Sequence, residues 1–209
     1  MPTLYNLIQG RNIDRLAALS DGIFAFAMTL LVIDLHLPTA AQVHSEGELV
    51  AALCALGPQW ITYGMSFLTL GIFWAGQQTQ LNHIDQGTRD FTWIHLGFLF
   101  AVTLVPLSTR LLAEFIHYRV ALGFYWLNIF VLGAMLYWSW AHATHRGLIK
   151  EDTPDEIRAS ICRRIVIAQS LYAAGAALCL IDTWFSIAAI VLVQLNYAIA
   201  PRAWWKKKA

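Results

Sequence analysis

The sequence predicts an all-α integral membrane protein with six transmembrane helices. Three observations carry this prediction: 58% of the 209 residues are hydrophobic and only 13% are charged, long apolar runs recur along the chain, and Lys and Arg are unevenly distributed between the segments that join these runs. A soluble domain has about 25% charged residues. Little sequence remains outside the runs, so residues 1–209 are expected to form a single membrane domain without a soluble enzyme.

A helix needs about 20 mostly apolar residues to cross the hydrocarbon core of a bilayer. Six stretches meet this requirement: 15–36, 52–78, 91–112, 118–142, 161–181 and 183–200. Asp182 separates the last two, which are therefore expected to form a tight hairpin. Gly57-Pro58 is expected to kink the second span and Pro106 to bend the third. A helix beginning near Pro154 is expected to run into the fifth span.

The positions of Lys and Arg predict the orientation of the spans. With the N-terminus in the cytoplasm, the inside segments hold twelve of the 14 basic residues and the outside segments hold only Arg110 and Arg119. The first outside loop carries Glu46 and Glu48 and no basic residue. Both termini are therefore predicted to be cytoplasmic. The C-terminal Trp-Trp-Lys-Lys-Lys segment, 204–208, is expected to anchor at the interface, with its lysines reaching anionic lipid.

The first span is unusual because Arg15, Ser20 and Asp21 lie at its beginning. A carboxylate near or within hydrocarbon is costly, so by default it marks a functional or assembly site with a partner. Adjacent helical residues are offset by about 100°, and Arg15 and Asp21 are therefore badly placed to pair within one helix. Any pairing is expected across helices or subunits. Ser20 can bond to its own backbone or join the same network.

Helical periodicity places an apolar stripe along the rest of this span. Gly22, Phe26, Thr29 and Ile33 share one face, and Leu30 flanks it. Thr29 supplies the one hydroxyl of the stripe. Taken alone, such a stripe fits ordinary helix packing as well as a pore lining.

Two further polar sites fall in or near the spans. Asp34 and His36, at the outer end of the first span, are either simply solvated or form a weak negative collar that raises the local concentration of cations. His95, inside the third span, is either a hydrogen-bonded packing residue or a group that titrates in a proton-linked step.

The sequence does not predict an enzyme. It has no G-x-S-x-G, H-E-x-x-H or Walker motif and no pair of fully intramembrane carboxylates. No cofactor, metal site or nucleic-acid partner is predicted. The T-V-G-Y-G filter of ordinary potassium channels is also absent.

Three stretches resemble the transmembrane protein 175 family, which comprises lysosomal potassium channels in animals and shorter prokaryotic relatives. Arg15-x-x-x-Leu-Ser-Asp21 resembles the R-x-x-x-F-S-D signature of its first helix. Ile72–Gln78 resembles the F-W-x-x-H-H end of the second helix, and Phe98–Ser108, continuing to Glu114, resembles the third. The departures are Leu19 for the signature Phe and Gln77-Gln78 for the His pair, which puts a network or pH response based on those histidines in doubt.

The resemblance implies a multi-pass homotetramer in the inner membrane of a prokaryote, with the first helix of each subunit lining a central pore. The narrow part would be apolar instead of carbonyl-lined. By position, the constriction falls on Phe26, where Ile or Leu is usual, and the next rings on Thr29 or Leu30 and then Ile33. This is the stripe that periodicity gives independently.

The implied function is a potassium-permeable cation channel in which Arg15, Ser20 and Asp21 tie neighbouring helices together. Its expected partners are copies of itself, membrane lipid and monovalent cations. One alternative is a proton leak through the same pore. A secondary transporter is a second alternative, which would need broken helices or paired repeats around a midplane site.

Overall fold

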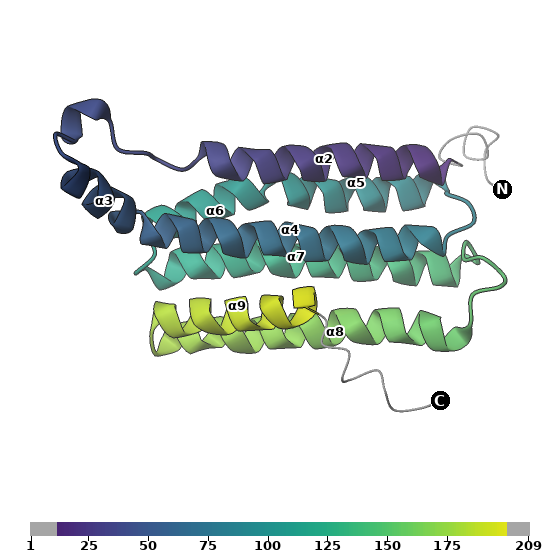
Figure 1. The fold of residues 1–209 in the computed structure, drawn as a ribbon. Helices are drawn as coiled ribbons and strands as arrows, with labels where there is room; N and C mark the ends of the chain where they lie inside the picture. The colour runs from purple at the N-terminus through teal and green to yellow at the C-terminus, as the bar shows by residue number, and fades with distance from the viewer. Residues whose placement is uncertain (1–11, 200–209) are drawn as a thin grey trace.

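A computed structural model describes residues 12–199, which form an elongated bundle of antiparallel helices (Figure 1). The helices of the bundle are α2 (Ile13–Ile33), α4 (Gly57–Asn82), α5 (Arg89–Thr103), the short α6 (Val105–Glu114), α7 (Arg119–His145), α8 (Asp155–Ala177) and α9 (Thr183–Ile199). The other helices are η1 (Ala40–Gln42), α3 (Glu46–Ala55) and η2 (Leu178–Leu180). The predicted anchor at 204–208 lies outside the described residues.

Four segments of the described chain are long and apolar enough to cross a membrane: Ile13–Ile33, Arg89–Glu114, Arg119–His145 and Asp155–Leu180. Helix α9 is apolar but shorter, with 17 residues, and α4 has 26 residues but is not among these four. The protein is therefore an all-helical integral membrane protein, with helices at the positions of all six predicted spans.

The prediction for the second span was wrong at its start. Residues 52–55 belong to α3, and α4 begins at Gly57 and continues to Asn82. Pro58 lies in the first turn of α4, where its missing N–H costs no helical hydrogen bond. The proline therefore starts a new helix instead of kinking a continuous one. Helix α3 stands away from the bundle (Figure 1), and none of its residues is buried.

Three other features of the chain agree with the predictions. The third span breaks at Leu104, between α5 and α6, with Pro106 in the first turn of α6. Helix α8 begins directly after Pro154, and the acidic residues in its first turn interact favourably with the helix dipole. Asp182 lies in the turn before α9, where its carboxylate accepts a hydrogen bond from the Trp184 N–H at 2.7 Å.

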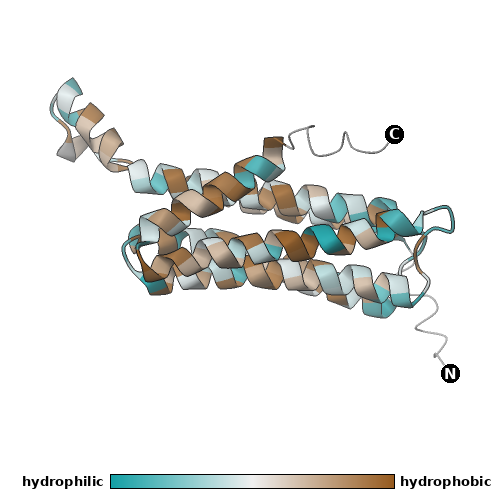
Figure 2. Ribbon diagram, turned by 90° about the horizontal axis from the view of Figure 1, so that it is seen from below, coloured by the Kyte–Doolittle hydropathy of each residue, from teal (hydrophilic) through white to brown (hydrophobic). Residues whose placement is uncertain are grey.

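Helix α2 lies on one side of the bundle against α4, α5 and α6, and the α8–α9 hairpin lies on the opposite side (Figure 1). The ends of the bundle are mostly hydrophilic, and its middle is mostly apolar apart from one hydrophilic segment on the side that faces the viewer (Figure 2). Two loops predicted to be cytoplasmic meet at one end: the Asp85 N–H donates to the Leu148 carbonyl at 2.9 Å, and the Lys150 N–H donates to the His83 carbonyl at 3.0 Å.

Candidate functional site: the first helix and the contacts that hold it

Helix α2 has two different faces. One face is buried in the bundle and consists of Leu16, Ser20, Phe24, Ala27 and Leu31. On the other face, the side chains of Phe26 and Ile33 are 64% and 73% exposed. Gly22 and Thr29 are also exposed and Leu30 is half-buried, so packing within its own subunit does not account for the apolar stripe.

Thr29 is the polar member of this stripe. Its hydroxyl donates to the Phe26 carbonyl oxygen at 2.8 Å. A hydroxyl group has one proton and two lone pairs. With the proton turned toward the helix, the Thr29 oxygen retains lone pairs that can face a cation.

Asp21 fixes α2 to α4. Its Oδ1 accepts hydrogen bonds from Trp74 Nε1 at 2.8 Å and from Gln78 Nε2 at 2.6 Å. Hydrogen bonds to a carboxylate are stronger than those between neutral groups. The carboxylate that the sequence singled out therefore has partners on a neighbouring helix of the same subunit.

Ser20 fixes α2 to α5 and, through it, to α4. The Ser20 hydroxyl oxygen lies 3.0 Å from His95 Nε2, and the Gln77 amide nitrogen lies 3.0 Å from the same ring atom. Ser20 and Gln77 are fully buried and His95 is 2% exposed. The ring of His95 also stacks on Phe91, with centroids 6.0 Å apart. His95 is thus a hydrogen-bonded residue between helices, one of the two roles predicted for it.

Six residues make up these contacts and are called the α2 tether: Ser20, Asp21, Trp74, Gln77, Gln78 and His95. Arg15 is not among them. Its side chain is exposed, and its backbone N–H donates to the helix-capping Asn12 side chain at 3.0 Å. Two of the three predicted network residues thus contact other helices within the subunit, and no such contact is recorded for Arg15 within residues 12–199.

Gln77 and Gln78 stand where a histidine pair is usual in the family, and the sequence did not predict their roles. Both glutamines lie in the tether, one at His95 and the other at Asp21. The amide groups thus retain contacts between helices without an ionisable ring. The role of Trp74 was missed, although its position one helical turn before Gln78 is a usable signal.

A second buried polar group, called the hydroxyl cluster, contains no residue of α2 and was also missed. It consists of Ser66 and Thr69 on α4, Thr109 on α6, Tyr125 on α7 and Gln194 on α9. The Tyr125 hydroxyl oxygen lies 3.2 Å from Ser66 Oγ and 3.0 Å from Thr69 Oγ1. Thr109 donates to Ser66 at 2.6 Å, and the Gln194 amide donates to Thr69 at 2.7 Å. Ser66 and Thr69, three residues apart in an apolar span, could have indicated it.

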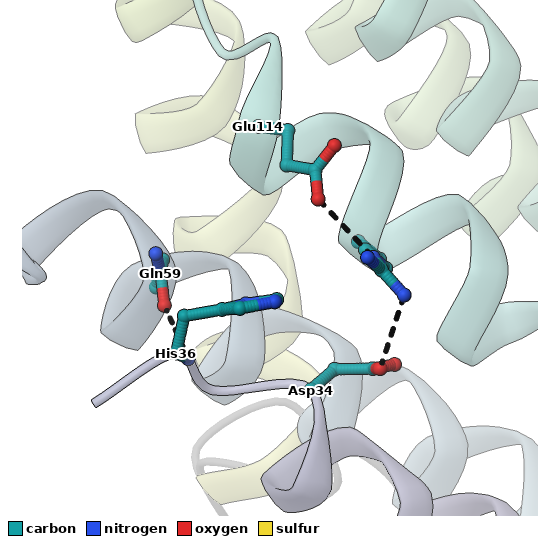
Figure 3. A network of polar contacts seen from close by, with 5 residues as sticks. Asp34, His36, Gln59 and Glu114 are labelled. Atoms are coloured by element: carbon teal, nitrogen blue, oxygen red, sulfur yellow. Dashed lines mark hydrogen bonds and ion pairs between the residues drawn. The ribbon is translucent and has the colours of Figure 1, made fainter. Parts of the chain in front are cut away.

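The predicted outer mouth contains a cation as well as carboxylates (Figure 3). Arg110 lies between two acids: its Nη1 is 3.9 Å from Asp34 Oδ1, and its Nε donates to Glu114 at 3.1 Å. The His36 backbone N–H donates to the Gln59 side chain at 3.1 Å. Arg110 offsets part of the negative charge expected from Asp34, and one carboxylate charge remains in excess.

Fold and site together define a class of protein: a helical membrane protein whose first helix is hydrogen-bonded to its neighbours on one face and apolar and open on the other. Residues 15–106 match the family described as "Endosomal/lysosomal potassium channel TMEM175". The chain is 30% identical over 188 residues to a protein named as a potassium channel of Streptomyces collinus, covering 88% of this chain and 90% of that protein. The chain therefore belongs to the TMEM175 family, a family of ion channels.

Three further similarities extend over different lengths. A protein named as a potassium channel of Chamaesiphon minutus is 29% identical over 195 residues, which cover 90% of this chain and 95% of that protein. The crystal structure of a lysosomal potassium-selective channel TMEM175 homolog from Chamaesiphon minutus superposes with a TM-score of 0.78 at 26% identity, over 90% of this chain and 97% of that one. The human protein named as an endosomal/lysosomal proton channel is 33% identical over 107 residues, 49% of this chain and 21% of that protein.

Proposed function

We propose that the chain is a potassium-permeable cation channel in which the exposed stripe of α2 lines the pore. The observation that carries the proposal is the division of α2 into a tethered face and an open apolar face. An apolar surface on a membrane helix has three possible neighbours: lipid, another copy of the chain, or an aqueous pore. The tether adjoins the start of the stripe, which is where a pore-lining helix needs a fixed rotation.

In this proposal four copies assemble around a central axis through α2. Rings of Phe26, Thr29, Leu30 and Ile33 then follow one another along the pore, with Asp34 at the outer mouth. An apolar ring admits an ion only if the ion stays hydrated or if dewetting is tolerable, so it can act as the gate. Four Thr29 oxygens replace part of a hydration shell, and potassium loses less than sodium because it is more weakly hydrated.

The proposed topology has six spans with both termini in the cytoplasm of a prokaryote. The loops that follow α4 and α7 support it, because they meet at the same end of the bundle, where Arg146 and Lys150 lie in the loop after α7 and Arg89 begins α5. Glu46 and Glu48 lie in the segment that joins α2 to α4 at the other end. This distribution follows the positive-inside rule. We expect no cofactor to be needed for conduction.

The test is planar-bilayer recording of the purified full chain with KCl on one side and NaCl on the other. Discrete unitary currents with a reversal potential displaced toward that of potassium are expected. Slow, saturable flux without unitary steps would instead indicate a secondary transporter. No flux from protein that elutes as a folded oligomer would reject the channel.

A proton leak through the same pore is the second candidate function, because animal relatives that match 49% of this chain are named proton channels. Replacing both salts by an impermeant organic cation and imposing a pH gradient separates the two functions. Current that persists under these conditions is carried by protons. Current that disappears leaves potassium as the principal permeant ion.

A further inference from the structure

Two adjacent arginines lie on the outward surface of α8. Arg163 and Arg164 are both exposed and fall within Asp155–Leu180, one of the segments able to cross a membrane. Arg163 is on the same side of the helix as Val166 and Ile167, which are 52% and 48% exposed. The two charges therefore border the apolar surface that α8 presents outward. Figure 2 views this side of the bundle and shows a hydrophilic band between apolar segments.

Within residues 12–199, neither arginine has a carboxylate partner. The guanidinium carbon of Arg164 lies 5.6 Å from the centroid of the Tyr197 ring, and no ion pair is recorded for either arginine in the described part of the chain. By contrast, Arg158, one and a half turns earlier, lies 3.5 Å from Asp155. The sequence has no Asp or Glu between Ile157 and Ile181, and none after Asp182. The missing counter-ion must come from outside the chain.

The position of the pair along α8 indicates where that counter-ion lies. Seventeen residues separate Arg163 from Leu180, the end of the apolar segment, or about 26 Å at about 1.5 Å per residue. The hydrocarbon core is about 30 Å thick. Helical side chains lean toward the N-terminus, and here that direction leads away from the apolar segment. The guanidinium groups can therefore extend to the level of lipid phosphates while their stems stay against hydrocarbon.

We propose that Arg163 and Arg164 form a binding site for the headgroup phosphate of an anionic phospholipid. The planar guanidinium group matches a phosphate with two parallel hydrogen bonds. Tyr197 holds Arg164 from the α9 side, and the acyl chains lie along Val166 and Ile167. A lipid with one net negative charge is favoured over a zwitterionic lipid, whose own cation opposes the arginines. The inference goes beyond the proposed channel, and binding can be measured without conduction.

The test uses the detergent-purified full chain with phosphatidylglycerol as the probe and phosphatidylcholine of the same acyl composition as its control. A ligand that binds the folded state raises Tm. Wild type is expected to gain several degrees more from phosphatidylglycerol than from phosphatidylcholine. Arg163→Gln/Arg164→Gln is expected to lose at least half of this difference. Arg146→Gln/Lys150→Gln, which removes two charges from the loop before α8, is expected to keep it.

Several results would overturn the proposal. An equal rise in Tm with both lipids would show that the arginines do not select charge, and a full lipid effect in folded Arg163→Gln/Arg164→Gln would place the site elsewhere. If millimolar inorganic phosphate alone reproduced the rise, the ligand would be a free anion. If the double variant does not fold, the single variant Arg163→Gln replaces it, and a full lipid effect there would also contradict the site.

Discussion

The α2 tether and the hydroxyl cluster are both buried polar groups between helices, but they join different parts of the subunit. The tether connects α2 to α4 and α5 through Asp21, Ser20 and His95. The hydroxyl cluster connects α4, α6, α7 and α9 around Tyr125 and does not include α2. The position of the proposed pore helix and the stability of the bundle behind it therefore depend on separate sets of hydrogen bonds.

The two groups also differ in charge and exposure. The tether contains a carboxylate at the surface of the single subunit, and Trp74, one of its two donors, is 42% exposed. The hydroxyl cluster is neutral and enclosed, with Ser66, Thr69 and Gln194 fully buried. An enclosed polar atom that loses its partner is costly, whereas a partly exposed one can turn to water. Substitutions at the exposed Asp21 end of the tether should therefore affect conduction first, and those in the hydroxyl cluster should affect stability first.

The largest effect is expected for Asp21→Ala, which removes the acceptor of both the Trp74 and the Gln78 hydrogen bonds. If the variant loses about 1.4 kcal/mol of the free energy that holds α2 against α4, the population of subunits with α2 in its correct position falls about tenfold. Potassium flux into proteoliposomes should fall by about that factor, with a small change in Tm.

The matched control is Asp14→Ala, which removes an exposed acid from the first turn of the same helix. It should leave the flux near that of wild type. Equal losses in both variants would mean that the charge of α2, and not its attachment to α4, sets the current.

The next effect is expected for Tyr125→Phe, which removes the buried hydroxyl that Ser66 and Thr69 both contact and leaves them only Thr109 and Gln194 as partners within the cluster. The expected cost is about 1–3 kcal/mol of stability, and for a chain of this size each kcal/mol lowers Tm by roughly 2–4 °C. The potassium/sodium reversal potential should not change. Tyr118→Phe, at a side chain 66% exposed, should have the Tm of wild type. A shifted reversal potential in Tyr125→Phe would contradict the proposal that the tether controls conduction and the hydroxyl cluster controls stability.

The smallest effect is expected at the outer cluster of Figure 3, where the charges are half-exposed. Arg110→Gln should change stability by less than about 1 kcal/mol. It leaves Asp34 and Glu114 without their cation, so potassium conductance should rise at low ionic strength. The rise should vanish near 1 M salt, where the Debye length is about 3 Å. Arg119→Gln, at the start of α7, should raise the conductance less.

The sequence was sufficient to predict the helices because each rests on local features. Apolar length sets α2, α7 and α8, and Pro106 and Pro154 mark a break and a start. The start of the second span was mispredicted because an apolar run continues from α3 through Gly57 into α4. Apolar length alone does not reveal that Pro58 begins a new helix there.

The candidate site was predicted only on α2. Periodicity identified Phe26, Thr29 and Ile33 as one face and marked Asp21 as a residue in need of a partner. It could not identify Trp74 and Gln78 as those partners, because they lie more than 50 residues away and come close only through the packing of α4 on α2. The hydroxyl cluster was missed for the same reason, since its members come from four helices.

The central claim is that the open face of α2 lines the pore, and the most direct measurement compares two phenylalanines of equal exposure. Phe26 on α2 is 64% exposed and Phe100 on α5 is 66% exposed, so truncation to Ala removes a similar apolar surface in each case. Single-channel recording under a potassium/sodium gradient should show altered conductance and reversal potential in Phe26→Ala and wild-type currents in Phe100→Ala. Unchanged currents in Phe26→Ala, with the protein folded, would contradict the claim.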